Sequence, residues 1–180
     1  MHFPWCLQKC PYCDFVSFAT EREAIDHARY ADAVLAEIET RRAELARRPI
    51  GTVFIGGGTP SLWEAGEMGR VIARLREVAE LASDVEVTAE CNPSSLDEGR
   101  ARAMGAVGVN RLRVGVQGLK RERLSFLGRL HDEEGAAGGA GGAGVGGRAG
   151  ERGCDLRRGA GARRARRRRR ARWGEWRTRG

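Results

Sequence analysis

The chain has 180 residues, of which 41% are hydrophobic and 31% charged, so it is long enough to bury the core of one ordinary domain, and a wholly disordered chain or a mini-protein is excluded. Its net charge of +8 is unevenly distributed. Residues 135–180 carry 14 basic and 3 acidic residues, whereas residues 1–134 carry 18 basic and 21 acidic ones. The basic character therefore belongs to the C-terminal segment alone.

The sequence has no run close to the roughly 20 apolar residues of a membrane span, and no basic stretch followed by an apolar one at its start. We therefore expect a cytoplasmic protein. Three of the five cysteines are crowded into Cys6, Cys10 and Cys13. In a reducing compartment such a group indicates a metal or redox site rather than a disulfide framework.

Residues 1–134 alternate short β-branched runs with helical periods. In chain order, the predicted elements are a strand at 1–5, a helix at about 20–47, strands at 52–55 and 85–89 that are each followed by a helix, a strand at 112–116 and a short helix at about 120–131. Strand followed by helix, repeated, predicts the α/β class with a parallel sheet.

Each of the three longer helices is preceded by a hydroxyl residue with a glutamate three positions later. The pairs are Thr20 and Glu23, Ser61 and Glu64, and Ser95 and Glu98. Such a pair can satisfy two free amides at a helix start reciprocally, as a capping box. The pattern therefore predicts that the helices begin at these hydroxyl residues.

The cysteines have the spacing CxxxCxxC. Pro11 lacks an amide donor and discourages a helix, so we expect a loop that turns its thiols inward. Three thiolates can hold three corners of a [4Fe–4S] cluster and leave the fourth iron open for another ligand. Two alternatives remain: a structural zinc site with His2 as fourth ligand, and three unrelated free thiols.

Further candidates follow the next strands. Gly57 and Gly58, before Thr59, allow a close approach of backbone to a ligand; Glu90 can accept the two hydroxyls of a ribose; Gln117 and Arg129 follow the strand at 112–116. In β/α barrels the site gathers at the C-terminal ends of the strands. The order of these groups therefore predicts one rim that binds a nucleoside-bearing ligand beside an iron–sulfur cluster.

Four segments carry a resemblance to a known family: HFPWCLQKCPYCDF, TVFIGGGTPSLW, AECNP and RLRVGVQGLKRERLSFLGRLH. Together, over residues 1 to about 132, they resemble the N-terminal half of the radical S-adenosylmethionine (SAM) proteins related to oxygen-independent coproporphyrinogen III oxidase. The resemblance implies an incomplete (β/α)6 partial TIM barrel with about four of its six β/α units. It also implies reductive cleavage of SAM as the chemistry of the family.

The resemblance further implies a role for each site residue. The [4Fe–4S] cluster would be ligated by Cys6, Cys10 and Cys13, and the methionine end of SAM would lie against Gly57, Gly58 and Thr59. The ribose hydroxyls would bind to Glu90, and the pocket would be completed by Gln117 and Arg129. No residue is assigned a catalytic role.

One position separates two branches of this family. The coproporphyrinogen oxidases carry a further cysteine two residues after the third ligand, where this chain has Phe15. The chain thus resembles the HemW-type haem-chaperone branch, which implies haem, a haem-receiving protein and an electron donor such as flavodoxin or ferredoxin as partners. The alternatives are a coproporphyrinogen III oxidase and, from another class, a basic zinc-containing nucleic-acid-binding protein.

Beyond residue 134 the alternation stops. Gly, Arg and Ala make up 37 of residues 135–180, too few large apolar groups to bury a core. We expect 1–134 to be the N-terminal part of the radical SAM core and 135–180 to be a disordered, low-complexity basic tail that arose by a frameshift; a nucleic-acid arm over 163–172 is the alternative. The strand at 112–116 would then form an unpaired edge.

Overall fold

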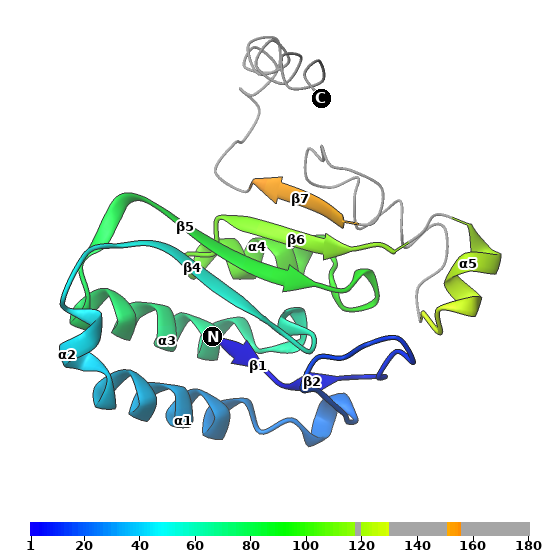
Figure 1. The fold of residues 1–180 in the computed structure, drawn as a ribbon, viewed down its shortest axis with the longest axis horizontal. Helices are drawn as coiled ribbons and strands as arrows, with labels where there is room; N and C mark the ends of the chain where they lie inside the picture. The colour runs from blue at the N-terminus through cyan, green and yellow to red at the C-terminus, as the bar shows by residue number, and fades with distance from the viewer. Residues whose placement is uncertain (118–119, 130–150, 156–180) are drawn as a thin grey trace, which may run out of the picture.

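The computed structural model describes residues 1–117, 120–129 and 151–155. Five strands form one sheet, in the spatial order β1 (His2–Phe3), β4 (Ile50–Gly57), β5 (Leu81–Cys91), β6 (Arg111–Gly115) and β7 (Glu151–Asp155). The first four are parallel to one another. The prediction of an α/β fold with a parallel sheet is therefore confirmed (Figure 1).

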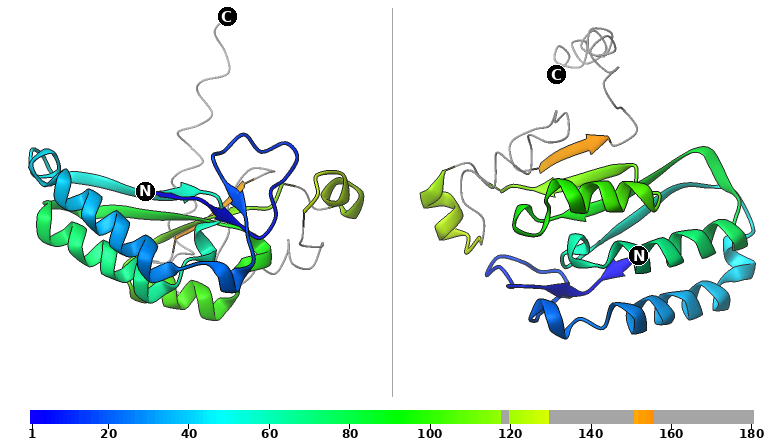
Figure 2. Two further views of the ribbon diagram at one scale, coloured as in Figure 1. Left: turned by 90° about the horizontal axis from the view of Figure 1, so that it is seen from below. Right: turned by 180° about the vertical axis from the view of Figure 1, so that it is seen from behind.

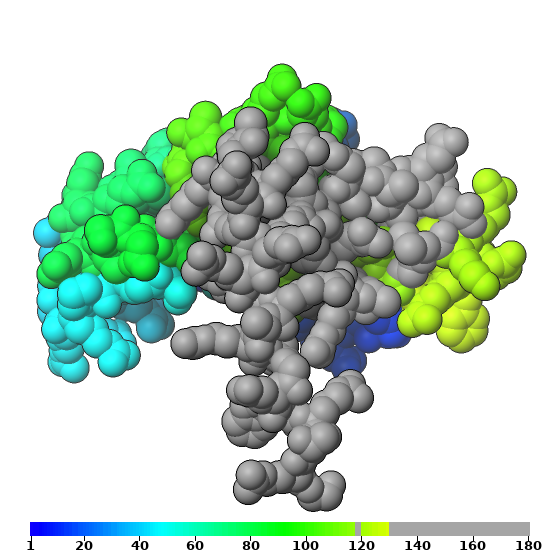
Figure 3. Space-filling view, turned by 90° about the horizontal axis from the view of Figure 1, so that it is seen from above, coloured from blue at the N-terminus to red at the C-terminus, as the bar shows by residue number. Residues whose placement is uncertain are grey.

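Three helices cover one face of this sheet: α1 (His27–Thr40), α3 (Ala65–Val78) and α4 (Glu98–Ala106). Figure 2 shows them on the side away from the cysteine-bearing loop. Two shorter helices, α2 (Arg42–Leu45) and α5 (Arg121–Phe126), lie at opposite ends of the molecule (Figure 3). This is the arrangement of an open β/α barrel wall, with helices outside.

The core lies between the sheet and its helices. Ile55, Val87 and Leu112 of the strands and Met68 and Ile72 of α3 are almost fully buried there. Successive side chains of a strand point to opposite faces of a sheet. Val87 of β5 faces the helices, so Glu90, three residues later, lies on the face without helices. The alternation that builds the core thus also directs the polar groups toward the inner side of the barrel wall.

The first strand is interrupted at Pro4. Residues 2–3 pair with β4, whereas β2 (Trp5–Cys6) pairs in parallel with β3 (Phe18–Ala19) in a separate two-stranded sheet. Proline has no amide hydrogen to continue a ladder. The single strand expected over 1–5 is therefore two short ones, and Cys6 belongs to the smaller sheet.

The capping-box prediction was wrong in all three places. α1 begins at His27, where Asp26 accepts the Arg29 amide at 2.9 Å, and α4 is capped by Asp97, which accepts the Arg100 amide at 2.6 Å. α3 begins at Ala65 without a side-chain cap. The 3-10 turns η1 (Arg22–Ala24), η2 (Pro60–Leu62) and η3 (Pro93–Ser95) occupy the expected starts.

The C-terminal segment differs from the expectation of disorder at five residues. Strand β7 pairs antiparallel with β6, with Leu112 opposite Cys154. An edge strand presents unpaired amides and carbonyls that a further strand can satisfy, which explains why a weakly apolar segment pairs here and why β6 is not an open edge. The rest of the expected tail, including the arm over 163–172, lies outside the described residues.

Candidate functional site

One cavity of about 180 Å³ opens at the C-terminal ends of β4, β5 and β6, beneath the loop that follows β2. The nine site residues predicted from the sequence all line it: Cys6, Cys10, Cys13, Gly57, Gly58, Thr59, Glu90, Gln117 and Arg129. They come from five separate places in the chain. The structure therefore brings the predicted rim together.

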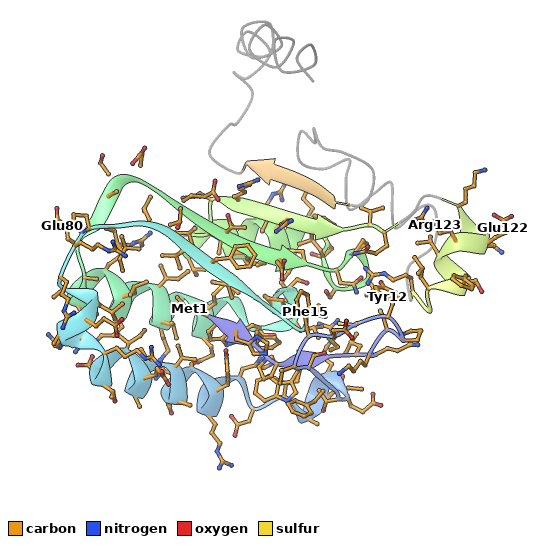
Figure 4. The ribbon with its side chains drawn as sticks, in the orientation of Figure 1. Met1, Tyr12, Phe15, Glu80, Glu122 and Arg123 are labelled. Atoms are coloured by element: carbon orange, nitrogen blue, oxygen red, sulfur yellow. The ribbon has the colours of Figure 1, made fainter. Side chains whose placement is uncertain are left out.

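The cysteine loop, residues 7–16, is irregular, as expected from its proline. Cys6 is buried, while Cys10 and Cys13 are partly exposed. The amide of Cys13 donates to the carbonyl of Cys10 at 3.0 Å, closing a turn around Pro11. Figure 4 shows Tyr12 and Phe15 of this loop at the end of the sheet toward α5, with Glu80 at the opposite end.

Two side chains from outside the cysteine loop donate hydrogen bonds to cysteine sulfurs. The hydroxyl of Thr59 donates to Cys6 Sγ at 3.4 Å, and Arg129 Nη1 donates to Cys10 Sγ at 3.7 Å. The guanidinium of Arg129 is fixed by a second bond from Nη2 to the carbonyl of Gly115 at 2.6 Å. A hydroxyl and a cation thus face two of the three thiols.

The two glycines are required by the first strand. Gly57 has a φ of 112°, and a Cβ there would lie 2.8 Å from the carbonyl oxygen of Phe3; at Gly58 it would lie 2.5 Å from that of Trp5. The amide of Gly58 donates to Phe3 at 2.6 Å. The sequence assigned these glycines to close approach of a ligand, whereas the described contact is with the backbone of residues 3–5.

Glu90 lies on the inner face of the sheet, where its carboxylate accepts the amide of Gly57 at 3.4 Å. Its other oxygen is 4.0 Å from Nη1 of Arg113, the residue directly opposite on β6. The carboxylate remains at the cavity wall. It can therefore accept two hydroxyl donors from a ligand while its charge is balanced by Arg113.

Gln117 adopts a φ of 61°, a conformation that is uncommon outside glycine and that tends to persist at functional sites. A Cβ at Gly115 would lie 3.2 Å from the side-chain nitrogen Nε2 of Gln117. The glycine therefore leaves room for the Gln117 side chain to fold back toward the cavity. Nε of Arg129 is buried and has no hydrogen-bond partner among the residues that the structure describes. It is a donor left over for an acceptor group of a ligand.

Several lining residues were not foreseen, among them Tyr12 and Arg113. Burial raises the pKa of Tyr12, and a hydrogen bond with Cys10 raises it further, while the charge of Arg129 lowers it. Arg113 is two residues before Gly115, a period that places both on one face of β6. Its position opposite Glu90 depends on strand register, which the sequence does not show.

The donor set fits a [4Fe–4S] cluster better than a zinc ion. Within the described ranges, no three or more His, Cys, Asp and Glu side chains are grouped so as to hold a metal ion, and the His2 ring contacts the carbonyl of Val16 at 2.7 Å. Three thiolates can hold three corners of a [4Fe–4S] cluster, and Cys6, Cys10 and Cys13 line the same cavity. The part of the chain that the structure describes also contains no helix able to cross a bilayer.

Comparison with known proteins agrees with this geometry. Residues 1–137 match the Radical SAM superfamily. The protein named heme chaperone HemW from Escherichia coli (strain K12) is 40% identical over 136 residues, which cover 76% of this chain and 36% of that protein. Radical S-adenosyl methionine domain-containing protein 1, mitochondrial, from Bos taurus is 37% identical, covering 76% of this chain and 30% of that protein.

A solved structure is also similar. Coproporphyrinogen III oxidase (HemN) from Escherichia coli, described as a radical SAM enzyme, has a TM-score of 0.67 and 30% identity, over 74% of this chain and 31% of that chain. The chain thus spans about a third of the length of the curated relatives that it matches.

Proposed function

Because the chain belongs to the radical SAM superfamily, we propose that residues 1–134 form the N-terminal part of a radical SAM core whose three cysteines, Cys6, Cys10 and Cys13, hold its cluster. The family implies SAM and a [4Fe–4S] cluster as cofactors. When bound, the cluster supplies one electron for breaking a sulfur–carbon bond of SAM. The convergence of all nine predicted residues on one cavity is the observation that supports this assignment.

The protein's share is to bind and orient SAM beside the sulfurs. We assign the ribose hydroxyls to Glu90, whose carboxylate is held by the Gly57 amide and balanced by Arg113. Arg129 has a buried donor to spare for the anionic end of the ligand, and Gln117 closes the same side of the cavity. Gly57 and Gly58 keep the loop against the first strand, so that the backbone rim is preformed.

For the biological role, we propose haem binding and delivery, in the cytoplasm, with a haem-receiving protein and a flavodoxin- or ferredoxin-like electron donor as partners. The identity to proteins named heme chaperone HemW supports this role. It is supported further by Phe15, which stands at the cavity where the related oxidases have a fourth cysteine.

The second candidate is oxygen-independent oxidation of coproporphyrinogen III, favoured by the structural similarity to HemN. The two roles differ in what they do with a porphyrin. A haem carrier retains haem through gel filtration and leaves coproporphyrinogen III unchanged, whereas an oxidase converts coproporphyrinogen III to a decarboxylated product. Product analysis after anaerobic incubation with SAM and a reductant distinguishes them.

Anaerobic reconstitution with iron and sulfide tests the cluster assignment. We expect a brown protein with about four irons per chain, the content of a cubane cluster. Cys6→Ala is expected to abolish most of the 400 nm absorbance and the iron, because two thiolates remain. Cys91→Ala is the matched control, since this buried cysteine donates to Ala89 at 3.7 Å. Equal iron in both variants, or zinc without iron in the unaltered chain, would contradict the assignment.

A further inference from the structure

The three cysteine sulfurs of the site differ in their surroundings. Cys6 Sγ accepts a hydrogen bond from a neutral hydroxyl, that of Thr59, and Cys10 Sγ accepts one from a cation, Arg129. Among the described residues, none of the hydrogen bonds reaches Cys13 Sγ. The trio is therefore asymmetric: two sulfurs face fixed donors and the third does not.

The threonine is held in place independently of any ligand. Its side chain is only 6% exposed, its amide donates to Trp5 at 2.8 Å, and its carbonyl accepts the Leu62 amide at 2.9 Å. With backbone and surroundings fixed, its buried hydroxyl has Cys6 Sγ, 53 residues away in the chain, as its hydrogen-bond partner. This contact is additional to the role of Thr59 at the methionine end of SAM that the resemblance implies.

The arginine reaches its sulfur from the turn that follows α5. Its amide donates to Leu124 at 2.9 Å, and the preceding Gly128 has a φ of 62°, so the chain leaves α5 in a left-handed turn. A Cβ at Gly128 would be 3.3 Å from Pro11, which shows how closely this turn approaches the cysteine loop. Anchored on Gly115, the guanidinium lies with its charge beside Cys10.

Donors to cysteine sulfur have a known physical effect. They stabilise the more negatively charged state, so hydrogen bonds to the sulfurs and nearby charge set the reduction potential of an iron–sulfur cluster. Hydrogen bonds from a charged donor are about twice as strong as neutral ones. Arginine beside Cys10 should therefore act more strongly than the threonine beside Cys6.

We propose that Thr59 and Arg129 are positioning residues for the cluster ligands Cys6 and Cys10, which raise the midpoint potential of the cluster and retain it, while Cys13 is the ligand without such support. The inference rests on the proposed cluster site. It adds a function for the Thr59 hydroxyl that is separate from any contact with SAM.

The test is a redox titration, followed by electron paramagnetic resonance, of the reconstituted full chain without SAM. We expect Thr59→Val to lower the midpoint potential and Thr59→Ser, which keeps the hydroxyl, to restore it. Arg129→Gln should lower it further than Thr59→Val. Loss of iron to a chelator should be about 10-fold or more faster in Thr59→Val and Arg129→Gln, as for other residues that support metal ligands.

Two matched variants serve as controls. Thr52→Val changes an exposed threonine at the start of β4, and Arg123→Gln changes an exposed arginine on α5; both are expected to keep the unaltered potential. Circular dichroism of the metal-free proteins separates misfolding from the proposed effect. If Thr59→Val folds but takes up no cluster while Thr59→Ser does, retention by the hydroxyl is supported.

Two outcomes overturn the inference in different ways. If the unaltered chain forms a cluster and Thr59→Val and Arg129→Gln have its potential and its iron retention, the inference fails and the proposed function stands. If the unaltered chain forms no cluster at all, both fail together.

Discussion

One wall of the cavity is lined by residues 57–59 and 90–92 at the ends of β4 and β5; together with the turns that follow, up to residues 63 and 95, we call this the strand-end wall. The other wall is the cysteine loop, residues 7–16. In the strand-end wall, Thr59, Ser61 and Ser95 are buried together with their backbone. In the loop, Tyr12 and Phe15 are 44% and 59% exposed. The strand-end wall is therefore buried in the fold, whereas the cysteine loop lies exposed over it.

The difference teaches which part of the site exists before a cofactor binds. Exposed loops with few buried contacts open at low free-energy cost, whereas strand ends in a core do not. Metal ligands on such a loop couple cofactor binding to local folding. We therefore regard the strand-end wall as preformed, and we propose that the cysteine loop becomes ordered when the cofactor binds.

Gly58 lies where the two walls join, so its replacement should have the largest effect on this comparison. In Gly58→Ala the new Cβ would lie 2.5 Å from the carbonyl oxygen of Trp5. Backbone must move, and we expect a loss of about 3 kcal/mol in the free energy of unfolding, the upper end for overpacking. Urea unfolding with an unchanged slope would measure it.

The control for this variant is Gly66→Ala in α3, where a Cβ would meet nothing within 4 Å. Alanine is favoured over glycine in a helix, so this change should be neutral or slightly stabilising. If both alanine variants unfold at the same urea concentration, the backbone at Gly58 and Trp5 can move apart at little free-energy cost, contrary to this prediction.

The next effect concerns the two serines that tie the strand-end wall together. Ser61 Oγ and Ser95 Oγ are 2.6 Å apart, and the Asn92 amide donates to Ser61 at 3.2 Å. Ser61→Ala would leave buried polar groups unpaired, at a cost of about 2 kcal/mol. The double variant, with Ser61→Ala and Ser95→Ala, should lose about 1 kcal/mol less unfolding free energy than the sum of the two single variants, because the two hydroxyls share one hydrogen bond.

A double-mutant cycle in urea measures this coupling. Ser94→Ala is the matched control on the same turn, since Ser94 is exposed and its hydroxyl bonds only to Asn92 within the described chain. Strict additivity of the two buried changes would show that the loops after β4 and β5 are not coupled through these hydroxyls.

The smallest effect tests the base of the cysteine loop. Tyr30 packs against Trp5 and Trp63 with ring centroids 5.1 and 4.9 Å away, and its hydroxyl donates to the carbonyl of His2 at 2.6 Å. Burial raises its pKa to about 12. Because the same tyrosine ionises at its ordinary pKa near 10 in the unfolded chain, the contribution of Tyr30 to the free energy of unfolding should be constant below pH 10 and fall as pH rises toward 12.

Tyr30→Phe should cost about 1 kcal/mol at neutral pH through the lost hydrogen bond and should flatten the decline in unfolding free energy between pH 10 and 12. Tyr12→Phe is the companion variant, because Tyr12 lies on the exposed loop and its pKa is raised as well. We expect Tyr30→Phe to change the fall in unfolding free energy above pH 10 more than Tyr12→Phe does. The opposite order would mean that the cysteine loop around Tyr12 is more firmly folded than the surroundings of Tyr30.

The sequence was a good guide wherever position along the chain decides the outcome. Eight of the nine predicted site residues lie in, or shortly after, a strand end, and parallel strands bring such ends to one rim; the ninth, Arg129, follows α5. Helix starts were predicted wrongly because Ser61 and Ser95 find each other across 34 residues, a contact that outweighs the local capping pattern. The bond from Thr59 to Cys6 and the pairing of Arg113 with Glu90 depend likewise on register and packing.

The attachment of Trp5 and Cys6 to the end of β4 has a consequence for damage. Because Trp5 and Cys6 are held by the end of β4 through Thr59, oxidative loss of the proposed cluster is expected to loosen only the cysteine loop, residues 7–16, while the pairing of β1 with β4 persists. The sheet and its helices would then keep their structure, and the cysteine loop would fold again against them. Repair would require fresh iron and sulfide, without refolding the protein.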